Sequence, residues 1–202
     1  MSSSSAPSSP GNGPLRVKGG SIRSKIAFVA STFGPAAEAE LVAELAEQGY
    51  AQVLEASWYD YDLFDHVLRF IADRWLGGDL GRLRDVGRFS ARTALTTTYA
   101  FYLGRGDLPG FLGRISKLHE RYYSRGSLTV LEQGATRCRL KLHGAGFYRE
   151  PDLQVAAGFY MGAAELLGCR EVRCRIEPGP DEADFLLEWS SSAPPAGSGD
   201  RS

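Results

Sequence analysis

The spacing of apolar residues changes once along this chain, and that change limits the folds open to it. From residue 22 to residue 122 the apolar side chains recur at the three- and four-residue intervals of amphipathic helices. From residue 128 to residue 189 they recur mainly at every second residue, in four segments interrupted by one helical segment. The order is therefore helices followed by β-β-α-β-β. It predicts an α+β fold with an antiparallel sheet covered by helices on one face.

Helices are predicted at 22–33, 35–48, 80–103, 109–122 and 152–167, with a central helix after Asp60. Pro35 suits a first helical position, and Gly49 suits a position just past a helix end. Ser57 and Asp60 have the spacing of a capping box, which predicts that the central helix begins there. That helix has the apolar stripe Leu63, Phe64, Val67, Leu68, Ile71 and Trp75.

Strands are predicted at 128–133, 136–142, 171–177 and 184–189, the first two as a hairpin around Gly134. In the second strand Cys138 alternates with basic neighbours, as do the two leucines that follow it. This alternation is typical of a strand with one buried face and one solvated, basic face.

The two ends of the chain differ from the middle in composition. Residues 1–16 and 190–202 are rich in Ser, Pro and Gly, which predicts a disordered leader and tail around a single α+β domain at 17–189. The leader lacks the basic start and apolar centre of a secretory signal, and three cysteines do not make a disulfide framework, so we expect the cytoplasm. No apolar run approaches the roughly 20 residues of a membrane span.

Charge is arranged in blocks although the net charge is -1, which argues against nucleic-acid binding. Residues 38–65 contain eight acids and no Lys or Arg, residues 82–141 contain twelve basic residues, and residues 177–188 contain five acids. One interpretation is that these blocks face one another or solvent within one fold. The alternatives are that the basic block forms an anion or partner surface, or that two copies pair acidic block to basic block.

Several short strings occur in an order that suggests a family. They are Gly19-Gly20-Ser21-Ile22-Arg23-Ser24-Lys25-Ile26-Ala27-Phe28, Ser57-Trp58-Tyr59, Val86-Gly87-Arg88-Phe89-Ser90-Ala91, Arg121-Tyr122-Tyr123 and Phe185-Leu186-Leu187-Glu188-Trp189. Together they resemble an uncharacterised bacterial family, prominent in myxobacteria, that looks like a branch of the vinyl-reductase-type small-molecule-binding domains. Those domains share a fold with haem-based nitric-oxide sensors and with transport-particle subunits that tether Golgi vesicles. The resemblance implies that fold, with ligand binding or assembly, but no reaction.

Two motifs of the related domains are incomplete here. Many vinyl-reductase-type domains have a pair of cysteines before the last strand; Cys174 matches the first, but Ala183 stands near the second position. Haem-based sensors of this fold have a Tyr-x-Ser-x-Arg clamp, and in the nearest string, Tyr122-Tyr123-Ser124-Arg125, the Arg is one residue early. We therefore carry over neither the paired-cysteine site nor haem, and we expect no cofactor.

The remaining chemical motifs have ordinary structural interpretations. Cys138, Cys169 and Cys174 are interpreted as small apolar residues on inward faces, not as metal ligands. No histidine lies in a nucleophile motif, so no catalytic residue is predicted. Gly158 and Gly162 predict close packing of their helix on the sheet or on another helix, and alternatively a helix crossing in a homodimer.

Aromatic and polar residues of the middle third supply the candidate ligand-binding residues. Most of these aromatics are expected in the core, and the others around an apolar pocket with a few polar tips. The candidates are Tyr99, Tyr102, His119, Tyr122 and Cys138.

The leading hypothesis is a non-catalytic regulatory module that binds a small apolar ligand or a protein partner. The alternative is a homodimeric scaffold without a ligand. A tetrapyrrole-related reductase or a haem sensor is a third hypothesis, with His119 and Cys138 as its candidate residues.

Overall fold

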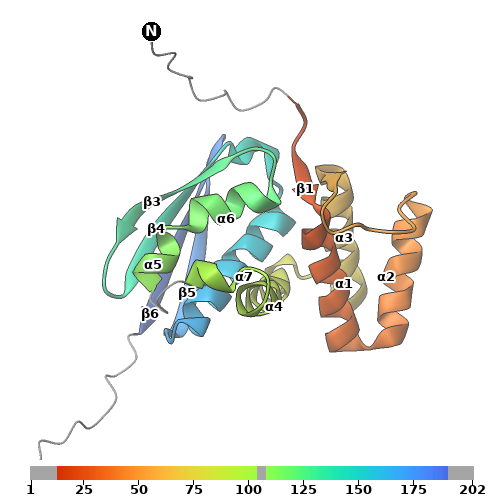
Figure 1. Cartoon of the computed structure of the whole chain (residues 1–202), viewed down its shortest axis with the longest axis horizontal. Helices are drawn as coiled ribbons and strands as arrows, with labels where there is room; N and C mark the ends of the chain where they lie inside the picture. The colour runs from red at the N-terminus through yellow and green to blue at the C-terminus, as the bar shows by residue number, and fades with distance from the viewer. Residues whose placement is uncertain (1–12, 104–107, 191–202) are drawn as a thin grey trace, which may run out of the picture.

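The computed structural model describes residues 13–103 and 108–190 and has the predicted α+β architecture (Figure 1). The N-terminal elements are β1 (Arg16–Lys18), α1 (Gly19–Phe33), α2 (Pro35–Glu47), β2 (Trp58–Asp60) and α3 (Tyr61–Trp75). The central helices are α4 (Leu83–Thr96), α5 (Leu108–Leu112) and α6 (Ile115–Tyr122), with short 3-10 turns at Leu80–Arg82 and Ala100–Leu103. The C-terminal elements are β3 (Ser127–Gln133), β4 (Arg137–His143), a 3-10 turn at Ala145–Phe147, α7 (Glu150–Leu166), β5 (Arg170–Pro178) and β6 (Glu182–Ser190).

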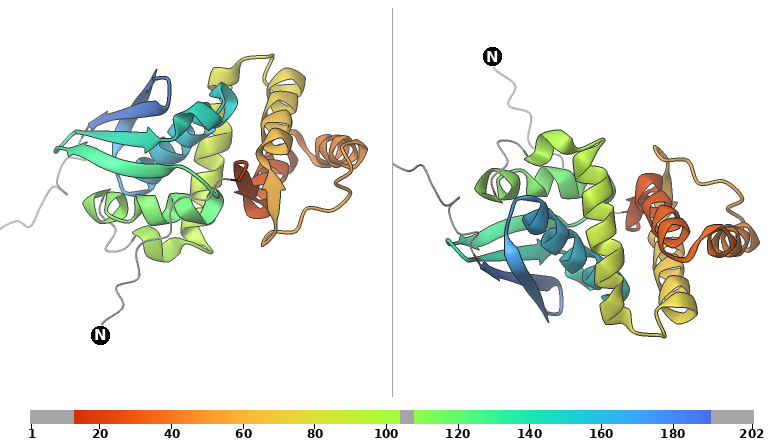
Figure 2. Two further views of the ribbon diagram at one scale, coloured as in Figure 1. Left: turned by 90° about the horizontal axis from the view of Figure 1, so that it is seen from above. Right: turned by 90° about the horizontal axis from the view of Figure 1, so that it is seen from below.

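The four C-terminal strands form an antiparallel sheet in the order β3-β4-β6-β5. Figure 2 shows α7 and the shorter helices on one side of this sheet, α4 beyond them, and α1 to α3 beyond α4. The predicted β-β-α-β-β order and the one-sided helical cover are both present. Within the described residues, no helix is long and apolar enough to cross a lipid bilayer.

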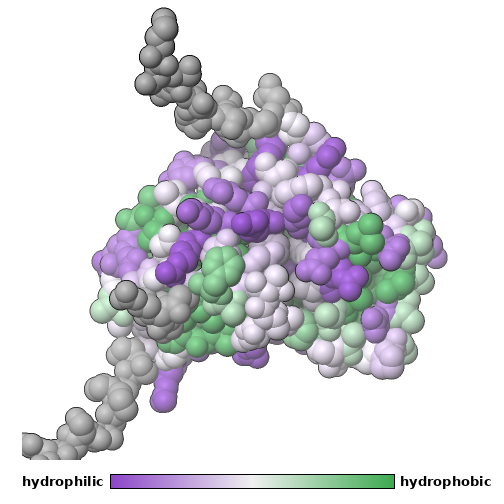
Figure 3. Space-filling view, in the orientation of Figure 1, coloured by the Kyte–Doolittle hydropathy of each residue, from purple (hydrophilic) through white to green (hydrophobic). Residues whose placement is uncertain are grey.

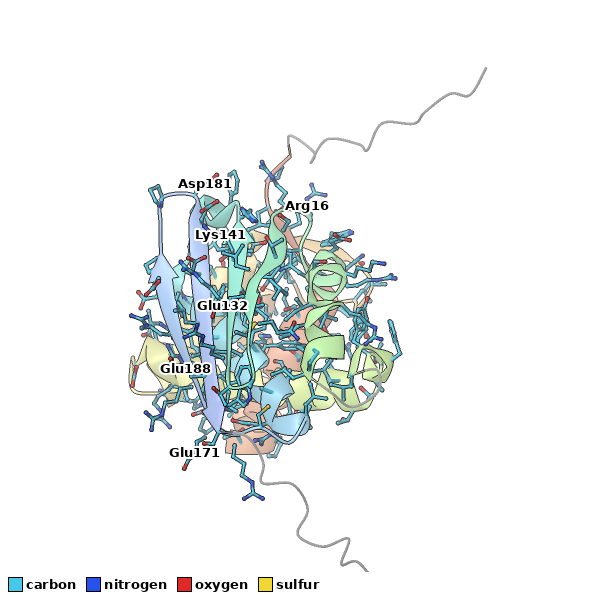
Figure 4. The ribbon with its side chains drawn as sticks, turned by 90° about the vertical axis from the view of Figure 1, so that its left-hand side faces the viewer. Arg16, Glu132, Lys141, Glu171, Asp181 and Glu188 are labelled. Atoms are coloured by element: carbon cyan, nitrogen blue, oxygen red, sulfur yellow. The ribbon has the colours of Figure 1, made fainter. Side chains whose placement is uncertain are left out.

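The two faces of this sheet differ in chemistry, as the alternation predicts. The helix-covered face buries Leu128, Cys138, Leu140, Leu142, Val172, Cys174, Phe185 and Leu187. The other face has charged side chains, several of them labelled in Figure 4. There Arg139 pairs with Asp184 across the strands, and Lys141 donates to Glu182 at 2.5 Å. Acids of the 177–188 block therefore pair with bases of the 82–141 block inside one chain.

Glycines bring the backbones of α4 and α7 into direct contact. A Cβ atom on Gly158 would lie 2.1 Å from the Arg84 carbonyl oxygen, and one on Gly87 would lie 2.1 Å from the Val155 carbonyl oxygen. Real Cβ atoms do not approach so closely, so only glycine permits this crossing. The predicted close packing of the Gly158–Gly162 helix on another helix is confirmed, and this glycine face is occupied within the chain.

Three sequence-based predictions of element boundaries are wrong. Trp58–Asp60 form strand β2, paired with β1, so the Ser57–Asp60 segment is not a capping box. The predicted helix at 80–103 ends at Thr96, where three consecutive threonines disfavour helix because they are β-branched. The predicted helix at 109–122 is divided into α5 and α6, with Gly113 between them.

The folded segment begins earlier than the sequence predicts. Leu15 is buried and β1 begins at Arg16, both inside the predicted leader. The rest of that leader up to residue 12, and the predicted tail from residue 191, lie outside the described residues.

Candidate functional site

A cavity of about 650 Å³ lies between α1, α4, α6 and α7. Its apolar wall consists of Ile115, Leu118, Leu128, Val155, Phe159 and Tyr160. Its interior polar residues are Ser21, Ser24, Lys25 and Ser90. Such a combination of an apolar wall with a few convergent polar groups is typical of small-molecule sites.

The cavity exists because small residues face one another between α1 and α4. Ser24 and Ser90 meet across this seam with 3.1 Å between their Oγ atoms, and Ala94 lines the cavity one turn further along α4. Side chains of this size do not fill the space that larger residues occupy elsewhere in a core. Because the backbones of α4 and α7 are in direct contact, α7 cannot shift towards α1 to fill the cavity.

Lys25 is the buried charged residue among the described residues that line the cavity. Only 3% of it is exposed, and its Nζ donates to Ser24 Oγ at 3.3 Å and to Ser90 Oγ at 3.2 Å. The amine also lies 5.4 Å from the centre of the Phe64 ring. Burial lowers the pKa of Lys25 to about 8, and the negative charge of Asp152 partly opposes this effect. Among the described residues, no carboxylate is within salt-bridge distance of Lys25.

Asp152, in the first turn of α7, is the nearby buried acid. Its Oδ1 accepts a hydrogen bond of 2.6 Å from the Tyr123 hydroxyl, whereas its buried Oδ2 accepts no hydrogen bond of normal length in the described part of the chain. Burial raises the pKa of Asp152 to about 6, and the Tyr123 hydrogen bond, Lys25 and the Tyr61 hydroxyl oppose that rise. Lys25 and Asp152 therefore attract each other through space, but they are not in contact.

His119 lies on α6 at the cavity wall and is held neutral. Tyr148 donates its only hydroxyl hydrogen to the Arg125 carbonyl at 2.7 Å, so in the 3.1 Å contact the His119 Nε2–H is the donor. Burial lowers the pKa of His119 to about 4, and its ring stacks on Tyr123 with 4.9 Å between centroids. The unprotonated Nδ1 is therefore the nitrogen left to accept a hydrogen bond.

Three of the five sequence-predicted residues line the cavity. Tyr99, His119 and Tyr122 do so, and the Tyr99 and Tyr122 rings meet edge to face at 5.6 Å. Tyr102 is buried beside Tyr99 but does not line the cavity. Cys138 also lies outside the cavity, on the covered face of β4, and burial raises its pKa to about 12.

Sequence reasoning missed the polar interior of the cavity. Lys25 is three residues after Ile22 and four before Val29, both fully buried, so it occupies an inward position on α1. A lysine on an apolar helix face is the sequence signal that could have identified it.

The molecular surface offers no comparable apolar site within the described residues. The large exposed apolar side chains are Val42, Leu54, Trp58, Phe101, Leu131 and Phe147. They come from six different segments, and hydrophilic residues separate the hydrophobic areas on the face shown in Figure 3. A more open hollow of about 760 Å³ lies beside α3, where apolar residues such as Leu15, Leu63 and Phe147 alternate with charged residues such as Asp60, Asp62 and Arg125.

Solved structures share this architecture of N-terminal helices followed by a β-β-α-β-β unit. The chain is similar to an H-NOX protein from S. oneidensis, with 15% identity, a TM-score of 0.71, and coverage of 87% of this chain and 97% of that one. It is also similar to an H-NOX protein from K. algicida, with 13% identity, a TM-score of 0.66, and coverage of 86% and 97%. The T. Tengcongensis H-NOX protein gives 13% identity, a TM-score of 0.65, and coverage of 86% and 98%.

The chain therefore has the H-NOX fold, and the fold that the sequence resemblance implied is confirmed as a fold. No family model and no curated protein matches the sequence. The bacterial family suggested by the short strings stays a prediction.

The structural neighbours include an Fe(II) unliganded H-NOX protein and a protein with a distorted porphyrin, so we test whether the cavity fits haem. His119 is the only histidine among the described residues of its wall, and its Nε2 is engaged by Tyr148. In the clamp-like string, Ser124 accepts from the Arg16 backbone and Arg125 donates to the Gly13 carbonyl, so both are engaged elsewhere. Tyr122 lines the cavity, but Gly126 stands at the position of the clamp arginine. Arg125 also lines the other hollow. The residues present do not fit haem.

Proposed function

We propose that this chain is a non-catalytic ligand-binding domain of the regulatory type, and that its ligand is a small organic molecule bound between α1, α4, α6 and α7. The observation that carries the proposal is the cavity of about 650 Å³, whose walls come from four helices and whose few polar groups converge inside. Its volume lies within the usual range for small-molecule sites, roughly 300–1,000 Å³. The H-NOX fold of the chain supports the proposal by analogy.

The side chains around the cavity are suited to binding. His119 is neutral and hydrogen-bonded to Tyr148, so its proton is held in place. Cys138, a candidate residue of the reductase hypothesis, lies outside the cavity, and burial raises the pKa of its thiol to about 12. A ligand in this cavity would be held mainly by burial of its own apolar surface. The hydroxyls of Ser21, Ser24 and Ser90 and the amine of Lys25 would select the ligand's polar group.

The experiment is native mass spectrometry with an absorption spectrum on the untagged full chain, followed by titration of a neutral fluorescent probe, phenylnaphthylamine. We expect saturable binding of one probe per chain and no haem absorption band. Ala156→Phe places a ring in the cavity and should abolish probe binding, whereas Ala39→Phe, on the exposed face of α2, should not. Equal binding by both variants, or a haem band, would refute the proposal.

Two observations that suggested a homodimeric scaffold are explained within one chain. The Gly158–Gly162 face contacts α4, and acids of the 177–188 block pair with bases of the sheet. We keep a homodimer as an alternative that sedimentation across micromolar concentrations tests. We also propose a cytoplasmic location, in keeping with the three free cysteines.

A further inference from the structure

We infer that the ligand of this cavity is an amphipathic anion, an apolar or aromatic body with one acidic group, and that Lys25 Nζ binds that group. The inference rests on the proposed function and adds the chemical class of the ligand. It assigns to Lys25 a ligand-binding role.

The first argument is the incomplete coordination of the amine. An ammonium group has three N–H donors, and Lys25 donates two hydrogen bonds, both of them long and to neutral hydroxyls. Both hydroxyls already donate elsewhere, Ser24 to the Ser21 carbonyl and Ser90 to the Val86 carbonyl. Their oxygens are therefore fixed as acceptors for the amine, and one donor of a buried cation that lines the cavity remains for a ligand.

The second argument is the lack of a directly paired counter-ion. Buried ammonium groups are stable when a carboxylate or phosphate contacts them. Asp152 attracts Lys25 through space, but its Oδ1 accepts from Tyr123, and no direct ion pair with Lys25 forms. An acidic group on the ligand would supply the missing contact.

The third argument is the arrangement of charge and apolar surface around the amine. Leu118, Val155 and Phe159 provide the wall for an apolar body. Lys18, Arg23 and Arg121 also line the cavity towards its opening, with Glu55 as the only acid among the described lining residues. This excess of positive charge attracts anions to the opening and disfavours cationic molecules.

The test compares two probes with the same aromatic skeleton, anilinonaphthalene sulfonate and neutral phenylnaphthylamine, by fluorescence titration of the full chain. Hydrogen bonds to charged groups predict that Lys25→Met weakens the sulfonate probe by roughly tenfold to a hundredfold. The neutral probe should bind the same variant as tightly as the unmodified chain, or more tightly. Lys117→Met, which removes an exposed lysine of α6 outside the cavity, should change neither affinity.

Each other outcome has a defined meaning. If Lys25→Met binds both probes like the unmodified chain, the anion is not held by Lys25 and this inference fails, although ligand binding stands. If Arg121→Met weakens the sulfonate probe and Lys25→Met does not, the anion sits at the opening and the inference also fails. If Lys25→Met loses both probes while its circular dichroism is unchanged, Lys25 maintains the cavity, which overturns its role as a charge contact. If neither probe binds the unmodified chain, the proposed function itself fails.

Discussion

Replacing Lys25 with methionine should make the protein more stable at neutral pH. Lowering the pKa of Lys25 from 10.5 to about 8 means that keeping its charge buried costs about 3 kcal/mol, at about 1.4 kcal/mol for each pKa unit. That figure already includes the attraction of Asp152. Methionine retains the length of the side chain and loses only the hydrogen bonds to Ser24 and Ser90, which contribute about 1 kcal/mol each because both are long. The expected net gain is about 1 kcal/mol at pH 7.

The pH dependence of this gain identifies its cause. Because the folded-state pKa of Lys25 is below its unfolded value, the cost is fully present below about pH 8 and disappears as the pH rises to 10.5. Urea unfolding of both proteins should therefore show the advantage of Lys25→Met at pH 7 and its loss, or a small reversal, near pH 10.5. Lys117→Met serves as the control and should stay within about 0.5 kcal/mol at both pH values. A Lys25→Met protein that is less stable than the unmodified chain at pH 7 would refute the reasoning, because it would show that the buried charge is net stabilising.

Three further outcomes follow from the same contacts. Gly158→Ala should destabilise the fold by at least about 2 kcal/mol in urea unfolding, because its Cβ would meet the Arg84 carbonyl, whereas Gly113→Ala, with 3.6 Å to its nearest neighbour, should be nearly neutral. Asp152→Asn should stabilise the protein by at most about 3 kcal/mol at pH 7, and the gain should shrink as the pH falls from 6 towards 4, because the raised pKa of Asp152 removes its charge there; a gain that persists at pH 4 would contradict this. Cys138 should resist a thiol reagent in the native protein, since burial raises its pKa to about 12, and rapid labelling at Cys138 in a peptide map would argue against the placement of β4.

Elements whose periodicity is set by burial could be predicted from the sequence. The alternation in β4 to β6 and the apolar stripe of α3 identified those elements, because one face of each packs against the core. The three-residue strands β1 and β2 could not be found in this way. Their pairing brings Arg16 beside Asp60, which are far apart in the sequence. In addition, a strand of three residues is too short to show an alternation of apolar and polar side chains.

The candidate site was predictable only where aromatic residues mark it. Tyr99, His119 and Tyr122 are near one another in the sequence because the turn after α4 and helix α6 are close together along the chain. Lys25 comes from α1, nearly a hundred residues before His119, and only the tertiary packing brings the two to one cavity. The alternation in β4 correctly places Cys138 on the buried face of the strand. It does not show which element covers that face, so it could not show that Cys138 lies outside the cavity.

The contact between α4 and α7 has a mechanical consequence. Two helices that touch through their backbones have no side chains at the crossing that could change rotamer, so they cannot slide or repack without separating. The seam between α1 and α4, by contrast, is made of small hydroxyl side chains and open space. We therefore expect a ligand in the cavity to be accommodated by small adjustments at the α1–α4 seam, while the contact between α4 and α7 stays fixed.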